Sequence, residues 1–344
     1  MSDLPIPLLR AYPALIPHVP LANLPGHQCP TPVTVSLDHA QLWLKHDDLT
    51  NRHYGGNKSR KLAFILGRLQ AQGQTQLVTF GGTGTNHGLA CAVHCQALGI
   101  GCEVLLFDQP PSASVTANFR AMQQAGARLT PCGSLLRTVL TYYGRALLSR
   151  LQPASRTAYL FAGGSSVEGV LAFIDAAFEL REQVAAGLCP EPECIVCPVG
   201  SGATLAGLTL GVALAGLRSR VIGVRVAPSH LGPFAACTTG TVAALMSATV
   251  KRLRAYGVTS PVLQNLPAPV LLDHYYGEGY GVASAAGQDA ASWFLQQRWA
   301  DERFVTVEGT YTAKALAALR DQLAQTSGPV LYWHTLNSSA EAFA

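Results

Sequence analysis

The chain has 344 residues, a length that predicts two domains at about 150 residues each. Hydrophobic residues make up 49% of it and charged residues only 13%, which excludes intrinsic disorder and argues against a fibrous or coiled-coil protein. The net charge of +4 is too small a surplus to predict nucleic-acid binding, so we expect a globular protein with a large core.

The first 57 residues differ in character from the rest of the chain. Prolines are frequent between Pro5 and Pro32, and they predict an extended arm rather than a packed unit. The N-terminus shows no basic region followed by a small-residue cleavage site, so no export signal is visible. We therefore predict a cytoplasmic protein.

From about residue 58 onward, helical and strand-like segments alternate. The spacing of apolar residues identifies each segment as a helix or a strand, and glycines mark where several of the helices end. Repeated βα units with short loops predict an α/β fold, with parallel sheets covered by helices on both faces. The predicted helices are 58–73, 85–98, 114–124, 135–151, 167–186, 203–217 and 313–324, and the predicted strands are 77–80, 102–107, 127–130, 158–161, 195–199, 221–226 and 330–333.

The stretch from Cys194 to Leu217 raises the question of a membrane span, since it holds no charged residue and exceeds the length of about 20 that a bilayer requires. Pro198 and five glycines interrupt it, so a buried strand, loop and helix fit it better. Cys194 and Cys197 form a lone C-x-x-C without a second pair or suitably spaced histidines. The sequence therefore predicts no membrane span and no metal site.

Three turn-rich segments fall at predicted strand ends or helix starts, where open α/β sheets bind ligands. None matches the motif of a nucleoside-triphosphate loop or of a dinucleotide site. In the third segment, Gly200 and Gly202 let backbone N–H groups at a helix start approach a phosphate, although an ordinary βα turn is the alternative. The segments are 54–61, 81–88 and 198–204.

Several motifs in register resemble the 1-aminocyclopropane-1-carboxylate deaminase/D-cysteine desulfhydrase family. The resemblance implies a fold-type II pyridoxal-phosphate enzyme with the tryptophan synthase β-like architecture of two parallel-sheet domains. It implies a large cofactor-binding domain made of 1–61 plus 171–344, and an inserted small α/β domain over 62–170. The motifs are Pro30-Thr31-Pro32, Lys45-His46-Asp47-Asp48-Leu49-Thr50, Gly55-Gly56-Asn57-Lys58-Ser59-Arg60-Lys61-Leu62, Thr85-Asn86-His87, Gly163-Gly164-Ser165-Ser166, Gly200-Ser201-Gly202-Ala203-Thr204, Gly279-Tyr280-Gly281-Val282, Gly309-Thr310-Tyr311-Thr312-Ala313-Lys314-Ala315 and His334-Thr335.

The resemblance assigns roles residue by residue. Lys58 matches the lysine that bonds covalently to pyridoxal phosphate and moves the Cα proton of the substrate. Asn86 matches the residue that hydrogen-bonds the phenolic oxygen of the cofactor, and Thr335 resembles the hydroxyl that faces its pyridine nitrogen. The resemblance also implies a phosphate loop of Gly200, Ser201, Gly202, Ala203 and Thr204, catalytic roles for Thr85, Tyr280 and Tyr311, ring stacking by Tyr311, and substrate contacts from Thr85, Asn86, His87, Ser165 and Tyr280.

The residue after Tyr311 favours one of the family's two activities. In the pattern of the deaminases that open the cyclopropane ring, the residue pair at this point is Tyr-Glu. This chain has Tyr311-Thr312, which resembles the desulfhydrase pattern. The implied reaction is α,β-elimination from a small D-amino acid; D-cysteine would give pyruvate, ammonia and sulfide. Ring-opening deamination, β-replacement, racemisation and cofactor binding without catalysis are the alternatives. The family also implies a homodimer.

Three departures from the family pattern put the substrate in question. Thr85 stands where the family usually has serine, and its extra methyl group would crowd a substrate carboxylate. Leu336 and Asn337 replace two glycines after Thr335, and His46 replaces an arginine. Either aromatic residue, Tyr280 or Tyr311, could instead serve only as a core residue.

Overall fold

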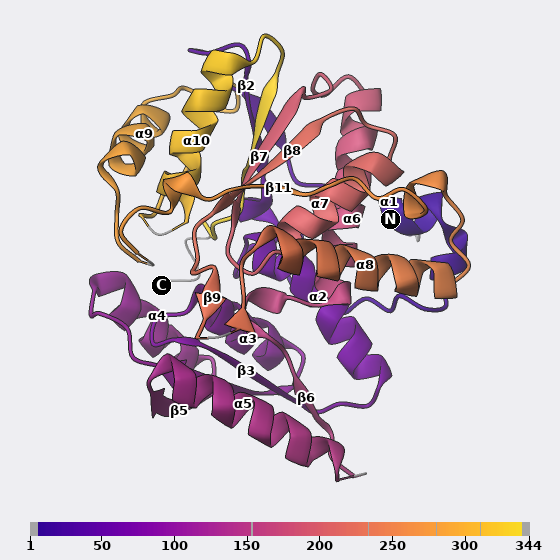
Figure 1. The fold of residues 1–344 in the computed structure, drawn as a ribbon, viewed down its shortest axis with the longest axis vertical. Helices are drawn as coiled ribbons and strands as arrows, with labels where there is room; N and C mark the ends of the chain where they lie inside the picture. The colour runs from indigo at the N-terminus through magenta and orange to yellow at the C-terminus, as the bar shows by residue number, and fades with distance from the viewer. Residues whose placement is uncertain (1–5, 153, 233, 280, 310, 339–344) are drawn as a thin grey trace.

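The strands form two main sheets in the computed structural model, which describes residues 6–152, 154–232, 234–279, 281–309 and 311–338 (Figure 1). In the larger sheet β1 is antiparallel to β2, and all the other neighbouring strands are parallel. Its strands, in spatial order, are β1 (Val33–Val35), β2 (Leu42–His46), β12 (Val330–His334), β7 (Cys194–Val199), β8 (Arg220–Arg225) and β11 (Val270–Leu272).

The smaller sheet is parallel throughout, and all its strands lie between β2 and β7 in the chain. The larger sheet is therefore built from segments on both sides of the smaller one. The domain limits at 61/62 and 170/171 stay a prediction. The strands of the smaller sheet, in spatial order, are β5 (Arg128–Gly133), β4 (Gly101–Phe107), β3 (Gln76–Gly82) and β6 (Thr157–Tyr159).

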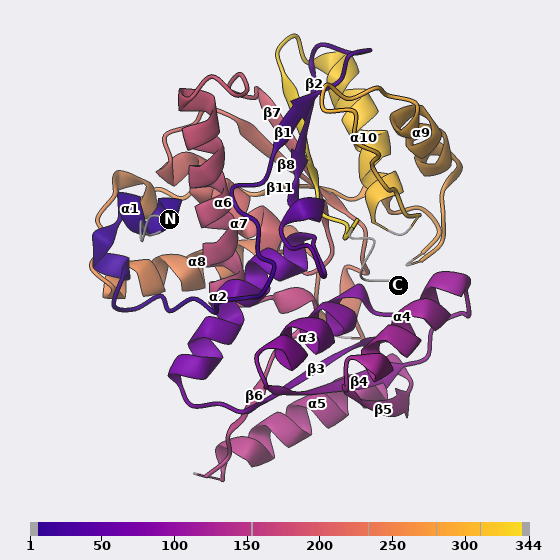
Figure 2. The ribbon, with the colours of Figure 1, turned by 180° about the vertical axis from the view of Figure 1, so that it is seen from behind.

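Helices cover both faces of each sheet, because alternate side chains of the strands are buried on opposite faces. On the larger sheet, α9 and α10 pack on one face and α6 and α7 on the other (Figures 1 and 2). On the smaller sheet, α5 packs on one face and α3 and α4 on the other. The helices are α1 (Pro7–Ala11), α2 (Asn57–Ala71), α3 (Asn86–Ala97), α4 (Ala113–Gln124), α5 (Leu135–Arg150), α6 (Val167–Ala185), α7 (Ala203–Leu214), α8 (Thr239–Ala255), α9 (Ala285–Leu295) and α10 (Thr312–Gln325).

The elements predicted from residue 58 onward are present, with their ends moved by a few residues. The uncharged stretch is β7, a turn and α7, and no helix in the described part of the chain is long and apolar enough to cross a membrane. The elements between residues 227 and 312, including α8 and α9, were not predicted.

The prediction of an extended N-terminal arm is wrong. Leu8 and Leu15 are fully buried in the main core, and β1 and β2 belong to the larger sheet. The prolines do not prevent this packing, because Pro7 and Pro13 stand at the first position of short helices, where the missing N–H has no intrahelical partner.

Candidate active site

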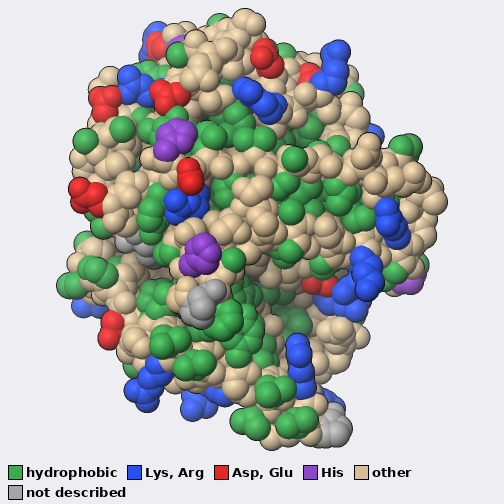
Figure 3. All heavy atoms as spheres, in the orientation of Figure 1, with side chains coloured by type: hydrophobic (Ala, Val, Ile, Leu, Met, Phe, Trp, Pro, Cys, Tyr) green, Lys and Arg blue, Asp and Glu red, His purple; other side chains and the backbone are tan. Residues whose placement is uncertain are grey.

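A cavity of about 330 Å³ lies between the carboxyl ends of the two sheets. It is lined by the start of α2, the end of β3, the start of α7 and the segment that follows β12. Figure 3 shows apolar side chains around the hollow between the two parts of the molecule. The topology thus brings the three turn-rich segments of the sequence to one place.

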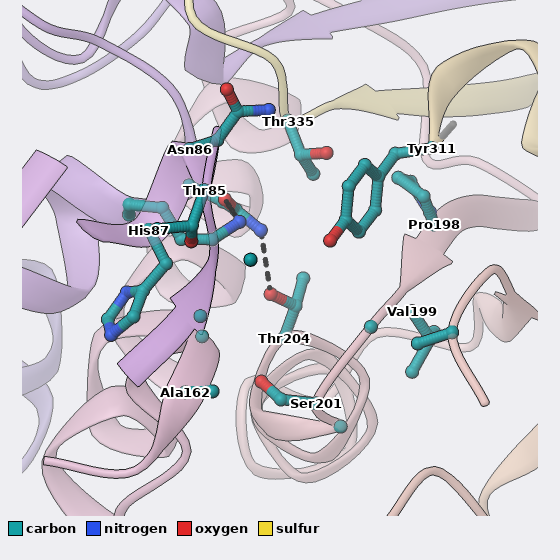
Figure 4. A pocket seen from close by; sticks show the side chains of 18 of the residues that line it. Thr85, Asn86, His87, Ala162, Pro198, Val199, Ser201, Thr204, Tyr311 and Thr335 are labelled. Carbon is teal, nitrogen blue, oxygen red and sulfur yellow. Dashed lines mark hydrogen bonds between the residues drawn. The ribbon is translucent and has the colours of Figure 1, made fainter. Parts of the chain in front are cut away.

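Lys58 stands in the first turn of α2 and faces this cavity. Its Nζ donates to Asn57 Oδ1 at 2.7 Å, and Asn57 Nδ2 donates to Thr204 Oγ1 at 3.2 Å (Figure 4). Burial lowers the pKa of Lys58 to about 8, although the charge of Glu308 opposes this effect. A large fraction of this amine is therefore neutral near pH 8, and a neutral amine is the nucleophilic form.

The segment after β12 holds the loop that leads into α2. Gly55 N donates to Asn337 Oδ1 at 2.6 Å, and Asn57 N donates to Thr335 O at 3.1 Å. Gly56 has φ +84°, and a Cβ there would lie 2.8 Å from Thr335 O, so only glycine allows this approach. Asn337, one of the departures from the family pattern, therefore helps to position Lys58.

The predicted phosphate loop opens α7. Gly202 has φ +89° and precedes Ala203 and Thr204, the first residues of the helix, whose N–H groups have no intrahelical acceptor. Gly200, Ser201, Gly202 and Thr204 line the cavity, whereas Ala203 does not. A Cβ on Gly200 would lie 3.2 Å from Tyr311 Cε1, which means that the tyrosine ring lies directly across the loop. The Lys58 Nζ lies 5.9 Å from the centre of the same ring.

Ser201, within this loop, lies against Gly163 of the smaller half of the molecule. Gly163 has φ +75°, and a Cβ there would lie 2.3 Å from Ser201 Oγ. Ser165 Oγ donates to Ser201 O at 2.7 Å. The structure thus uses the Ser165 hydroxyl to tie two loops together, and Ser165 is absent from the cavity lining.

Thr85 and Asn86 come from the start of α3. The Thr85 hydroxyl caps the helix by accepting from Gly88 N at 3.2 Å. Its methyl group lies against two glycines, since a Cβ on Gly81 or Gly88 would lie 2.8 Å or 2.4 Å from Thr85 Cγ2. The glycines thus accommodate the bulk that distinguishes threonine from serine here.

Asn86 lies beside Thr335 at one side of the cavity, with Tyr311 next to Thr335 (Figure 4). The imidazole of His87 points away from these side chains, and its Nε2 lies 3.0 Å from Thr79 Oγ1. Burial, followed by the charges of Lys58 and Lys61, lowers the pKa of His87 to about 3, so the ring is neutral at pH 7. Tyr280 lies outside the described residues.

Lys61 lines the cavity one helical turn after Lys58, and it was not among the predicted site residues. Its Nζ donates to Gly163 O at 3.2 Å, beside the phosphate loop. Burial, followed by the charge of Lys58, holds the pKa of Lys61 well below its ordinary value. A bound anion would reverse this shift. The sequence signal that could have identified Lys61 is its i, i+3 spacing from Lys58, which places both lysines on one face of the helix.

Glu308 lies near the cavity, and its carboxylate caps the start of α10. The backbone N–H groups of Tyr311 and Thr312 donate to Glu308 Oε1 at 2.6 Å and 2.9 Å. The Thr312 hydroxyl donates to Glu308 O at 2.7 Å. This carboxylate therefore holds the backbone of Tyr311 at the start of α10.

A buried cluster of four charged groups supports α2 on the side away from the cavity. Arg60 on α2 bonds Asp47 Oδ1 at 2.7 Å and Glu179 Oε2 at 2.9 Å. Lys45 Nζ bonds the other Glu179 oxygen, Oε1, at 2.5 Å. Two cations thus face two anions, and each charged group is compensated.

These residues fit pyridoxal phosphate. Lys58 supplies an amine of lowered pKa, and the start of α7 supplies N–H donors for a phosphate. Lys58 and Lys61 are the only charged side chains among the described residues that line the cavity, so no carboxylate there opposes the binding of an anion. The described ranges contain no group of three or more histidine, cysteine, aspartate or glutamate residues that could hold a metal.

Comparisons with known proteins agree with this fit. The family model described as "Pyridoxal-phosphate dependent enzyme" matches residues 24–335. Nocardicin C-9' epimerase from Nocardia uniformis subsp. tsuyamanensis is 34% identical over 333 residues, which span 95% of this chain and 94% of the epimerase. D-cysteine desulfhydrase from Klebsiella pneumoniae (strain 342) is 27% identical over 306 residues, 86% of each chain.

A similar fold is found among solved structures. The structure described as the ACC deaminase homologue superimposes with a TM-score of 0.77 at 22% identity, covering 98% of this chain and 96% of that one. This likeness confirms the predicted α/β fold of two parallel sheets of the fold-type II kind.

Proposed function

This chain belongs to the pyridoxal-phosphate dependent enzymes, and we propose that it catalyses α,β-elimination from a D-amino acid, in the manner of a D-cysteine desulfhydrase. The observation that carries the proposal is the position of Lys58, whose amine faces the cavity and is linked through Asn57 to Thr204 at the start of α7. With D-cysteine as substrate, the Cα proton and the β-thiol leave, and hydrolysis gives pyruvate, ammonia and sulfide.

Some residues of the site would hold the cofactor, and Lys58 would also act on the substrate. Bound pyridoxal phosphate supplies an aldehyde and an electron sink. Lys58 would hold the cofactor covalently, and its Nζ would move the Cα proton of the substrate. Residues Gly200 to Thr204 would hold the phosphate through backbone N–H groups, and Lys61 would add a cation.

Three further side chains would orient the cofactor ring. Asn86 would donate from Nδ2 to its phenolic oxygen, Tyr311 would stack on its ring, and the neutral Thr335 hydroxyl would be the partner of its pyridine nitrogen. A neutral partner would leave that nitrogen unprotonated and would moderate the electron sink, which would favour elimination. Thr85, with the backbone at the start of α3, binds the substrate carboxylate.

The lining of the cavity supports elimination over ring opening. The pattern of the deaminases in this family has Tyr-Glu where this chain has Tyr311-Thr312. The Thr312 hydroxyl donates a hydrogen bond to Glu308 O, just before the start of its own helix. The carboxylate of Glu308 is bonded to two backbone N–H groups. Among the described residues that line the cavity, no carboxylate is available for the ring-opening reaction.

Epimerisation at Cα is a second candidate, because the relative that is 34% identical over 95% of the chain is named an epimerase. Both reactions begin with removal of the Cα proton, and they differ in whether a β-substituent then leaves. The two are distinguished by whether a keto acid or the opposite stereoisomer accumulates.

The experiment is a substrate panel with the cofactor-loaded enzyme and its Lys58→Ala variant. D-cysteine, β-chloro-D-alanine, 1-aminocyclopropane-1-carboxylate and the L-isomers are assayed for keto acid, and exchange of the Cα proton is followed in D₂O. Keto acid from the D-isomers alone supports the proposal. Exchange and inversion without keto acid favour epimerisation, and no reaction with any D-isomer contradicts D-specific elimination.

The predicted cytoplasmic homodimer stays a proposal beside this function. The family resemblance supports the homodimer, and the mass of the native protein by light scattering tests it. A mass of one chain, about 36.3 kDa, would contradict the dimer.

A further inference from the structure

One wall of the cavity is made of aromatic and aliphatic side chains. Phe80 and Phe107 stand at the carboxyl ends of β3 and β4, Leu135 begins α5, and Phe161 follows β6. The rings of Phe80 and Phe161 meet edge to face with centres 5.0 Å apart, which fixes both. Phe107, Leu135 and Phe161 are half-buried, so part of each faces the cavity.

The larger half of the molecule completes this wall. Leu231, in the short strand β9 (His230–Leu231), packs against the cluster that contains Phe80 and Phe161. Figure 1 shows β9 standing over the smaller sheet. Leu336, which replaces a glycine of the family pattern, adds a half-buried aliphatic side chain to the lining. We call Phe80, Phe107, Leu135, Phe161 and Leu231 the apolar wall.

The apolar wall carries no group that could recognise a second charge on the substrate. The charged side chains among the described lining residues are Lys58 and Lys61, and both belong to the cofactor end. A carboxylate or ammonium group held against the wall would lose water without gaining a partner. An apolar substituent would instead cover side chains that otherwise face water.

We propose that the amino-acid substrate carries an apolar or aromatic substituent beyond its β-position, and that this substituent lies against the apolar wall. The inference rests on the proposed function, since it takes the substrate to be an amino acid that reacts at Cα. It changes the expected substrate class from small D-amino acids such as cysteine to D-amino acids with a larger apolar side chain.

A matched series of S-substituted D-cysteines tests the substrate class. S-methyl, S-benzyl and S-carboxymethyl-D-cysteine each lose the Cα proton and the corresponding thiol, and hydrolysis gives pyruvate and ammonia. We expect kcat/KM for the benzyl compound to exceed that for the methyl compound by about tenfold or more. The carboxymethyl compound should be the poorest of the three. Equal or lower kcat/KM for the benzyl compound would overturn the inference.

A variant in the apolar wall tests whether the wall causes this preference for the benzyl compound. Leu231→Ser should lower the benzyl-to-methyl ratio of kcat/KM by about tenfold, since it puts a hydroxyl where the substituent packs. Leu188→Ser is the matched control, because Leu188 is 62% exposed and does not line the cavity. An unchanged ratio in Leu231→Ser, with the folded state verified by circular dichroism, would overturn the placement.

Two readouts without turnover separate this inference from the proposed function. D-phenylalanine and D-alanine are compared for binding, by the change in the visible absorbance of the loaded enzyme, and for Cα proton exchange in D₂O. Tighter binding and faster exchange of D-phenylalanine support the apolar wall. Reaction of D-alanine with no preference for D-phenylalanine overturns the inference alone, whereas no binding or exchange with any amino acid overturns the proposed function as well.

Discussion

The side-chain amide of Asn118 donates to Asn86 Oδ1 at 2.8 Å, and it also donates to Gly84 O at 2.9 Å. Asn118 lies on α4 and is 5% exposed. Because its Nδ2 must be the donor to both oxygens, the Asn86 amide is held with Oδ1 toward Asn118 and Nδ2 directed elsewhere. Asn118 is therefore a positioning residue for the side chain that we expect to meet the phenolic oxygen of the cofactor.

Replacing Asn118 by aspartate should disturb Asn86 while it keeps the shape of the side chain. The carboxylate cannot donate to Asn86 Oδ1, so we expect the Asn86 amide to turn and kcat to fall about tenfold, which corresponds to roughly 1.4 kcal/mol. The visible absorbance maximum of the loaded enzyme should move as well, which a merely structural role would not cause. Asn265→Asp, at an exposed position, is the control.

Loading of the cofactor should depend on pH through Lys58. Burial lowers its pKa to about 8 in the folded protein, so the neutral amine grows from a minor to the major form as the pH rises past that value. The loading rate should therefore rise between about pH 7 and pH 9 and then level off. Stopped-flow absorbance measures it, and a midpoint near the ordinary lysine value of about 10.4 would contradict the burial effect.

Gly163→Ala should weaken cofactor binding at the phosphate loop. The new Cβ would lie 2.3 Å from Ser201 Oγ, so Ser201 must move. We expect the dissociation constant for pyridoxal phosphate to rise about tenfold. Gly187→Ala is the matched control, because Gly187 has a similar φ of +72° and a Cβ there would contact nothing within 4 Å. Equal effects of both variants would show that backbone strain alone is responsible.

Glu179→Gln should destabilise the protein by about 3–5 kcal/mol, since it leaves the buried cations Arg60 and Lys45 facing the single anion Asp47. Chemical denaturation measures this change. Glu182→Gln is the control, because the partly exposed pair of Glu182 and Arg10 should contribute at most about 1 kcal/mol.

The carboxylate of Glu179 also predicts how the stability of the protein changes at acidic pH. Burial by itself raises the pKa of Glu179, but the charges of Arg60 and Lys45, with their hydrogen bonds, hold it well below the ordinary value. The stabilising contribution is therefore complete at neutral pH and is lost only as the pH falls below about 4.3, the unfolded value. Wild type should lose stability over that acidic range more steeply than Glu179→Gln.

The secondary structure from residue 58 onward was largely predictable because its signals are local. The helix predicted over 114–124 is α4 at Ala113–Gln124, where Ser112 caps the helix. The N-terminal arm was not predictable in the same way, since β1 and β2 are ordered by pairing with a strand almost 290 residues later in the chain: Leu42 pairs with Val330. Propensity within a short window carries no information about such a partner.

The sequence by itself determined the loop from Gly200 to Thr204 as a candidate, because its glycines and close spacing form a local pattern, and it determined Lys58 through the resemblance of several motifs in register to one family. Only the tertiary structure decided how Asn118 holds Asn86, how Glu179 compensates Arg60, and how Leu231 joins Phe161 in the apolar wall. The physical reason is that hydrogen-bond partners and cavity walls are selected by packing between elements. The partners in these contacts are tens of residues apart in the chain, and no local pattern records which of them will meet.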